Sequence, residues 1–114
     1  MIYIVDCNVL IAKCIKKATA RPTKNFTNAI DCMNEISKGN LPTLIFLEIL
    51  LDGPDGFTFL NELVSYTDTA EIPVVIVSSI DFKNQDLSSY GIVGILNKEE
   101  MTPINIKEYV EKYA

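Results

Sequence analysis

A run of β-branched residues from Val74 to Val77 constrains the fold of this chain more than any other feature of its sequence. Apolar residues without polar alternation suit a strand that is covered on both faces, as in parallel sheets flanked by helices. Pro73 precedes the run and Ser78 follows it, so both ends are marked. We therefore predict a buried parallel strand at this point.

Apolar runs alternate with segments of helical periodicity along the rest of the chain. Further strands are predicted at residues 2–5, near residue 26, at 44–50 and at 92–96. Apolar residues recur every three or four positions in between, which predicts helices at residues 9–20, 29–36, 57–64, 82–89 and from 102 onward. Five successive βα units predict an α/β fold with a doubly wound parallel sheet, and ligands are expected at the carboxyl ends of its strands.

Length and composition narrow the class of protein. The 114 residues are expected to form a single domain, 1–114. No apolar run approaches the roughly 20 residues of a membrane span, so we expect a cytoplasmic protein with no membrane partner. The net charge of −5 disfavours nucleic acid as a direct partner, unless the basic residues cluster on one face. The absence of histidine excludes catalytic nucleophiles that need a histidine base, and it excludes zinc sites built from histidine.

The three cysteines, Cys7, Cys14 and Cys32, do not form a closely spaced pair. A metal or redox motif needs such pairing, so neither is expected. Unpaired cysteines are commonly buried, and the prediction is of free thiols that are mostly buried.

Two segments near predicted strand ends contain acidic residues, IVDCN at residues 4–8 and LEILL at residues 47–51. They resemble the first and third strands of the receiver domains of bacterial response regulators. In that family two adjacent acids help to bind Mg²⁺, and an aspartate on the third strand accepts a phosphoryl group. The resemblance places Asp6 and Cys7 in the acidic pocket, with a cysteine replacing the second acid. It places Glu48 at the phosphoacceptor position.

The segments IPVVIVS at residues 72–78 and GILNK at residues 94–98 resemble the fourth and fifth strands of the same family, so that the resemblance covers essentially the whole chain. Ser78 matches the switch serine or threonine, and Lys98 matches the invariant lysine. Ile95 stands where many members carry a switch aromatic residue.

The resemblance implies a flavodoxin-like (βα)5 fold with strand order 2-1-3-4-5. It also implies a module of a two-component phosphorelay rather than an enzyme. Such modules act through a protein partner, an output domain or a second copy, commonly on the face formed by the fourth helix, fifth strand and fifth helix.

The substituted residues change the chemistry that the resemblance implies. A neutral thiol at Cys7 is a poor ligand for Mg²⁺, so no cofactor is expected beyond weak binding of Mg²⁺ at Asp6. Glu48 is one methylene longer than aspartate, and its carboxylate is expected to reach the ammonium of Lys98. Two interpretations stay open: Glu48 mimics a permanently charged state, or it forms a purely structural ion pair in a rigid adaptor.

Aspartates in the loop after the predicted third strand have two interpretations as well. Asp52 and Asp55 carry oxygens that suit a cation near Asp6, but Asp-Gly pairs more often form turns or cap helices. Capping is the favoured prediction for Asp55. Similarly, Pro103 is expected in the first turn of the last helix.

The segment VDCNVLI at residues 5–11 also resembles the opening of PIN-type metal-dependent ribonucleases. These enzymes gather carboxylates around divalent cations, and Asp6, Glu48, Asp81 and Asp86 would form that set. The middle of the chain and the acidic net charge fit a receiver better. The nuclease is therefore kept as the alternative function.

Overall fold

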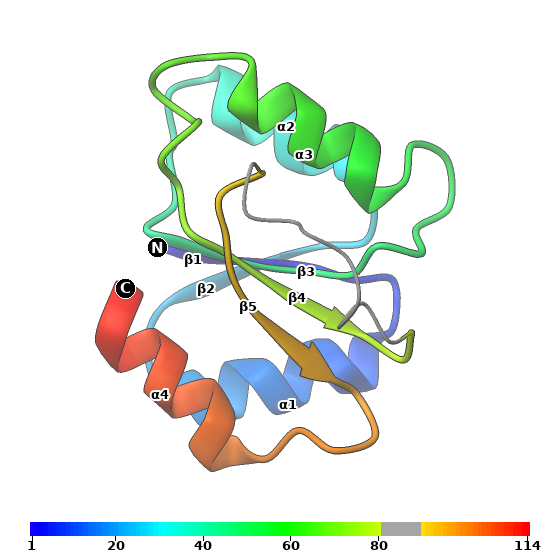
Figure 1. Ribbon diagram of the computed structural model, residues 1–114, viewed down its shortest axis with the longest axis vertical. Helices are drawn as coiled ribbons and strands as arrows, with labels where there is room; N and C mark the ends of the chain where they lie inside the picture. Colours follow the sequence, from blue (N-terminus) through cyan, green and yellow to red (C-terminus); the bar gives the residue numbers. More distant parts are fainter. Residues whose placement is uncertain (81–89) are drawn as a thin grey trace.

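The computed structural model describes residues 1–80 and 90–114 and shows a sheet between two layers of helices (Figure 1). The strands are β1 (Ile2–Val5), β2 (Thr23–Phe26), β3 (Leu44–Leu47), β4 (Val74–Ser78) and β5 (Ile92–Asn97). The helices of the described residues are α1 (Val9–Thr19), α2 (Ala29–Ser37), α3 (Gly56–Val64) and α4 (Pro103–Tyr113). Helices α1 and α4 cover one face of the sheet, and α2 and α3 cover the other.

All strand pairs are parallel, and the strand order is β2-β1-β3-β4-β5. The predicted doubly wound sheet and its order 2-1-3-4-5 are confirmed. Strands β1 and β3 are neighbours in the sheet, with Val5 opposite Leu47. From β1 the chain continues to β2 on one side of this pair, and from β3 it continues to β4 and β5 on the other side. The residues that follow these two strands are therefore neighbours at the topological switch point, where sheets of this kind bind ligands.

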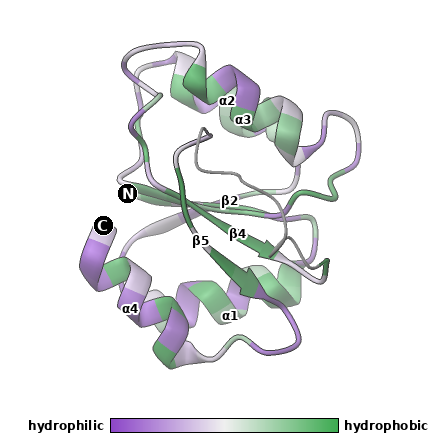
Figure 2. Cartoon of the chain, viewed as in Figure 1, coloured by the Kyte–Doolittle hydropathy of each residue, from purple (hydrophilic) through white to green (hydrophobic). Residues whose placement is uncertain are grey.

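Both faces of the sheet are buried. Alternate residues of β1 and β3 point to opposite faces, so Tyr3 and Ile45 pack toward α2 and α3 while Ile4 and Phe46 pack toward α1 and α4. Every residue of β4 is buried, which confirms the prediction from its β-branched run. In Figure 2, β4 and β5 are coloured mainly as hydrophobic, whereas each helix carries both hydrophobic and hydrophilic residues.

The structure corrects one predicted boundary and leaves one helix untested. The third strand ends at Leu47 rather than at Leu50, because the chain turns after Glu48 and leaves the ladder. The helix predicted at residues 82–89 lies outside the described residues. The last predicted helix is α4 of the described residues. That helix begins as expected, with Pro103 in its first turn and Thr102 as its N-cap. No helix of the described residues is long and apolar enough to cross a membrane.

The expectation of mostly buried thiols is wrong for two of the three cysteines. Cys7 and Cys14 are exposed, and only Cys32 is buried. Cys7 follows β1 at the edge of the sheet, and Cys14 lies on a solvent-facing position of α1, which sequence periodicity alone did not separate from the apolar stripe. Burial raises the pKa of Cys32 to about 12, and nearby Glu35 adds to the rise.

The thiols should differ in reactivity. At pH 8 N-ethylmaleimide is expected to label Cys7 and Cys14 in the folded protein and to spare Cys32, whose thiolate is disfavoured by burial. Intact-mass spectrometry counts the adducts, and the urea-unfolded protein is the control in which Cys32 also reacts. Labelling of Cys32 at the rate of the other two thiols in the folded protein would contradict the assigned burial.

Candidate functional site

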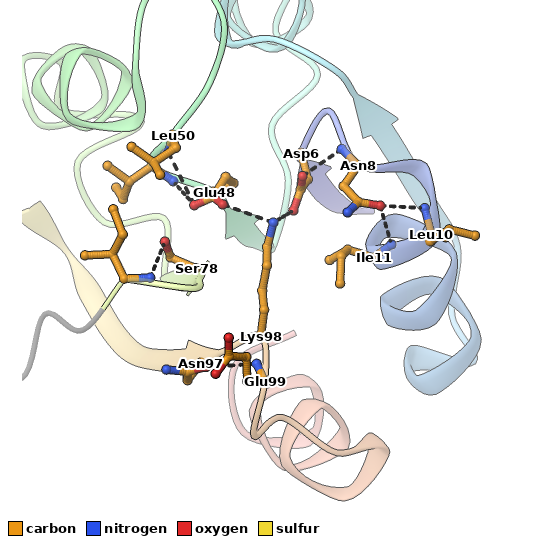
Figure 3. A network of polar contacts seen from close by, with 12 residues as sticks. Asp6, Asn8, Leu10, Ile11, Glu48, Leu50, Ser78, Asn97, Lys98 and Glu99 are labelled. Atoms are coloured by element: carbon orange, nitrogen blue, oxygen red, sulfur yellow. Dashed lines mark hydrogen bonds and ion pairs between the residues drawn. The ribbon is translucent and has the colours of Figure 1, made fainter.

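Three charged side chains meet at the carboxyl ends of β1, β3 and β5 (Figure 3). The ammonium Nζ of Lys98 lies 2.9 Å from Asp6 Oδ2 and 3.0 Å from Glu48 Oε1. Asp6 is 2% exposed and Glu48 is 5% exposed, so two carboxylates share one cation almost out of contact with water. We call this group the Asp6–Glu48–Lys98 cluster.

Backbone hydrogen bonds hold each residue of the cluster at its place. The amide of Asp6 donates to the last carbonyl of β2 at 2.9 Å, and the amide of Glu48 donates to the last carbonyl of β1 at 2.9 Å. The amide of Lys98 donates to the last carbonyl of β4 at 3.0 Å. Each residue therefore extends the ladder by one bond beyond its own strand, and the sheet itself sets the spacing of the three side chains.

The second oxygen of Glu48 stabilises the loop that follows β3. Oε2 accepts hydrogen bonds from the backbone amides of Ile49 at 2.7 Å and Leu50 at 3.3 Å. These amides have left the sheet ladder and would otherwise lack partners inside the protein. A single buried carboxylate thus joins the ion pair to the local turn.

Asp6 has the equivalent role at the start of α1. Its Oδ1 accepts a hydrogen bond from the amide of Asn8 at 2.8 Å, and the Asn8 side chain caps α1 by accepting from Leu10 at 3.0 Å and Ile11 at 3.3 Å. Oδ2 is buried, and the ammonium of Lys98 is its polar neighbour. The charge of Asp6 is therefore balanced by Lys98.

Opposing effects act on the proton of Lys98. Burial is the largest single effect and lowers its pKa. The hydrogen bonds and attraction of Asp6 and Glu48 together outweigh burial, so the pKa of Lys98 is raised above its ordinary value of 10.5. The ammonium therefore stays charged across the physiological range, with one carboxyl group on either side of it.

Close backbone packing at Gly56 supports the position of Glu48. The amide of Gly56 donates to the carbonyl of Ile49 at 2.9 Å. A Cβ atom at residue 56 would lie 2.7 Å from Ile49 Cα and 2.9 Å from the Glu48 carbonyl oxygen, closer than such atoms approach. Asp55 caps α3 through Thr58 at 3.0 Å, as predicted. The sequence showed the cap but not the requirement for glycine beside it, because that contact depends on the folded loop.

Other residues singled out by the sequence lie outside the cluster. The thiol of Cys7 is exposed. Ser78 is buried, and its hydroxyl accepts a hydrogen bond from the amide of Ile80 at 3.3 Å. Ile95 is partly buried against the apolar core on the side of α2 and α3, and Asp52 is exposed. Within the described part of the chain, neither Cys7 nor Ser78 joins Lys98 in a side-chain hydrogen bond.

The carboxylates of the alternative nuclease set are only partly placed. Asp6 and Glu48 meet, but Asp81 and Asp86 lie outside the described residues. Among residues 1–80 and 90–114, no group of three histidine, cysteine or acidic side chains is arranged to hold a metal ion.

No protein-family model matches the chain, and no curated protein matches its sequence. The receiver domain of NtrX from Brucella abortus has a similar structure, with 24% identity and a TM-score of 0.82 over 98% of this chain and 96% of that one. A two-component response regulator from Clostridium difficile aligns with 22% identity and a TM-score of 0.81 over 97% and 92% of the chains. The Mn²⁺-bound response regulator Rcp1 aligns with 17% identity and a TM-score of 0.76 over 97% and 88%.

These similarities define the fold as that of response regulator receiver domains, as the sequence resemblance predicted. The same fold makes up about a quarter of the longer NtrX chain, of which the alignment covers 26%. In NtrX, therefore, the fold is joined to further polypeptide.

Replacing Gly56 by alanine should destabilise the protein by about 1–3 kcal/mol, because the added methyl group overlaps the backbone of the β3–α3 loop. Urea unfolding measures the change. Gly53→Ala is the control, since its positive φ of 75° is strained but open space surrounds the new methyl group. Equal or smaller destabilisation by Gly56→Ala than by Gly53→Ala would contradict the proposed contact.

Lys98→Met should be more destabilising, by about 3–5 kcal/mol, because it leaves two buried carboxylates facing each other. Glu48→Gln in the same background removes one of those charges, so the double variant is expected to recover part of the loss. Urea unfolding of the four proteins at pH 7 tests this cycle. Additive effects of the two substitutions would show that the side chains are not coupled.

The same variants predict a pH dependence. The folded-state pKa of Lys98 is raised, so its stabilising effect is fully present below the ordinary value of 10.5 and is lost as the pH rises through the folded-state value. The difference in unfolding free energy between the wild type and Lys98→Met should therefore be constant from neutral pH to the ordinary value of 10.5 and shrink as the pH rises from there to the folded-state value. A difference that grows in alkali would contradict the direction of the shift.

Proposed function

We propose that this chain is a receiver-type module of a two-component signalling system that acts by protein contact and does not depend on phosphorylation. The supporting observation is the position of the Lys98 ammonium between the carboxylates of Asp6 and Glu48. On this proposal the protein is a cytoplasmic signalling module without enzymatic turnover.

The residues of the cluster do not fit Mg²⁺. Phosphoryl transfer to a carboxylate needs a divalent cation that offsets the charge of the transferring group. Rcp1 has a Mn²⁺-bound form. On our proposal Cys7, whose thiol is exposed, stands in this chain at the position of the second pocket acid. The ammonium of Lys98 lies within 3.0 Å of both carboxylates, so a metal bridging them would have to displace a buried cation. We therefore derive no step through a metal ion.

Glu48 is proposed to keep the strand ends in one arrangement. Its carboxylate holds Lys98 through one oxygen and the amides of Ile49 and Leu50 through the other. A hydrogen bond to a charged group contributes about 1.5–3 kcal/mol. A permanently formed ion pair of this kind, at the site where a receiver would change its charge, supports a module whose partner binding is constant.

The proposed partner surface is the face of β5 and α4. A groove of about 470 Å³ lies there and is lined in part by Ile95, Met101 and Tyr109. Tyr109 lies against Gly94, where an added Cβ would meet its ring within 2.4 Å. The longer chain of NtrX supports an output domain as one partner, and a separate protein or a second copy are the others.

Nothing in the described residues favours the nuclease alternative. Such an enzyme needs several carboxylates free to bind metal, whereas Asp6 and Glu48 are neutralised in part by Lys98. The receiver fold and the acidic net charge of −5 also support the signalling function over the nuclease.

Acetyl phosphate with Mg²⁺ tests the proposal. Wild-type protein is expected to gain no phosphoryl adduct by intact-mass spectrometry, because both the nucleophile and a metal ligand are substituted. Cys7→Asp combined with Glu48→Asp should bind Mg²⁺ measurably in an NMR titration, since it restores two pocket acids and shortens the carboxylate that holds Lys98. Asp52→Asn is the control for loop charge and should leave the response to Mg²⁺ unchanged.

Two outcomes would contradict the proposal. A stable phosphoryl adduct on the wild type would show that Glu48 or a neighbour accepts phosphate. A Cys7→Asp/Glu48→Asp variant that folds but binds Mg²⁺ no better than the wild type would show that these positions do not form a receiver pocket.

A further inference from the structure

Helix α1 is basic although the whole chain is acidic. The chain has 15 acidic and 10 basic residues, yet α1 contains Lys13, Lys16 and Lys17 and no acidic residue. Arg21 follows the helix within two residues of its end. All four side chains belong to exposed residues, so the structure gathers a good part of the positive charge on one side of the protein.

These charges are not neutralised within the described part of the chain. Lys24 pairs with Glu35 and Lys98 pairs with Asp6 and Glu48, but no ion pair involves a basic residue of α1. Arg21 donates a hydrogen bond to the Ala114 O atom at 3.0 Å. The positive potential of α1 is therefore directed at solvent.

A groove lies beside these charges, between α1 and α4 on the same side of the sheet (Figure 1). It has a volume of about 410 Å³ and is lined by Cys14, Lys17, Ala18, Ala20, Pro103 and Lys107. Its small apolar side chains offer space for one apolar side chain of a ligand, and each helix contributes one lysine. Apolar contact and positive charge thus occur together.

We propose that this α1–α4 basic surface, formed by Lys13, Lys16, Lys17, Arg21 and Lys107, binds a short acidic peptide segment of a protein partner. An apolar side chain of the segment enters the groove, and carboxylates on either side of it pair with the lysines. The Asp6–Glu48–Lys98 cluster takes no part, so the inference goes beyond the proposed function and does not rest on it.

The dimensions of the surface favour a short peptide over a long polyanion. Lys13 and Lys17 are separated by about 6 Å at the rise of an α-helix, and the Debye length is about 8 Å at physiological salt. The attraction is therefore local. Helix α4 also carries the exposed Glu108 and Glu111, and the net charge of the chain is −5. A duplex or a bilayer would extend over these repulsive regions, whereas a short acidic segment would not.

Fluorescence anisotropy with a short fluorescein-labelled peptide rich in glutamate and leucine tests the proposal on the full chain. The peptide is expected to bind at low salt and to bind more weakly as salt is added. Lys17→Gln with Lys107→Gln should weaken its affinity at least about fivefold, since two charge contacts are lost. The matched control, Lys38→Gln with Lys112→Gln, changes the net charge equally away from the groove and should change affinity by less than about twofold.

The proposal would be overturned if the peptide did not bind at low salt, or if the control pair weakened binding equally. It would also be overturned if phosphatidylserine-containing vesicles or a single-stranded oligonucleotide bound more tightly than the peptide. Self-association in sedimentation that Lys17→Gln with Lys107→Gln abolishes would overturn it as well, because the occupant would then be a second copy. A thermal unfolding profile for each variant shows that lost binding is not lost folding. None of these readouts depends on Mg²⁺ or phosphoryl transfer, so they leave the proposed function separately testable.

Discussion

The shared ion pair of Lys98 connects the ends of three strands that are far apart in sequence. Charges that leave water need partners, and each member of the cluster finds one only when β1, β3 and β5 are in register. Asp6 and Glu48 also hold the first amides of the loops that follow them. The position of the loops over the carboxyl edge of the sheet thus depends on a few buried charges rather than on apolar packing alone.

That dependence limits the chemistry of the site. A carboxylate engaged by Lys98 on one oxygen and by loop amides on the other has little freedom to receive a new group without reorganising the loop. On the proposed assignment of Glu48 to the phosphoacceptor position, the charge that stabilises the fold is also the charge that a switching receiver would have to change, so stability and switching would compete at one residue.

The net charge of −5 does not reveal that α1 is basic while the chain as a whole is acidic. Acidic residues dominate the whole chain, but the basic residues of α1, which form no ion pair with the described residues, lie next to the groove shared with α4. A positive face on a negatively charged domain attracts acidic groups that the rest of the surface repels. This arrangement favours selective contact with a small acidic ligand over general affinity for polyanions.

Periodicity and composition by themselves determined the fold class, since the apolar runs and helical stripes report local burial that each segment needs wherever it lies. They also determined the cap at Asp55 and the place of Pro103 in the first turn of the last helix, which are local features. Only the tertiary structure decided the end of β3, the exposure of Cys14, the close contact at Gly56 and the sharing of Lys98 by two carboxylates. The sharing of Lys98 depends on distances between segments far apart in the chain, and the contact at Gly56 depends on how the loop after β3 folds back on itself. Such distances are set by the packing of the sheet, its helices and its loops rather than by the residues next to them in sequence.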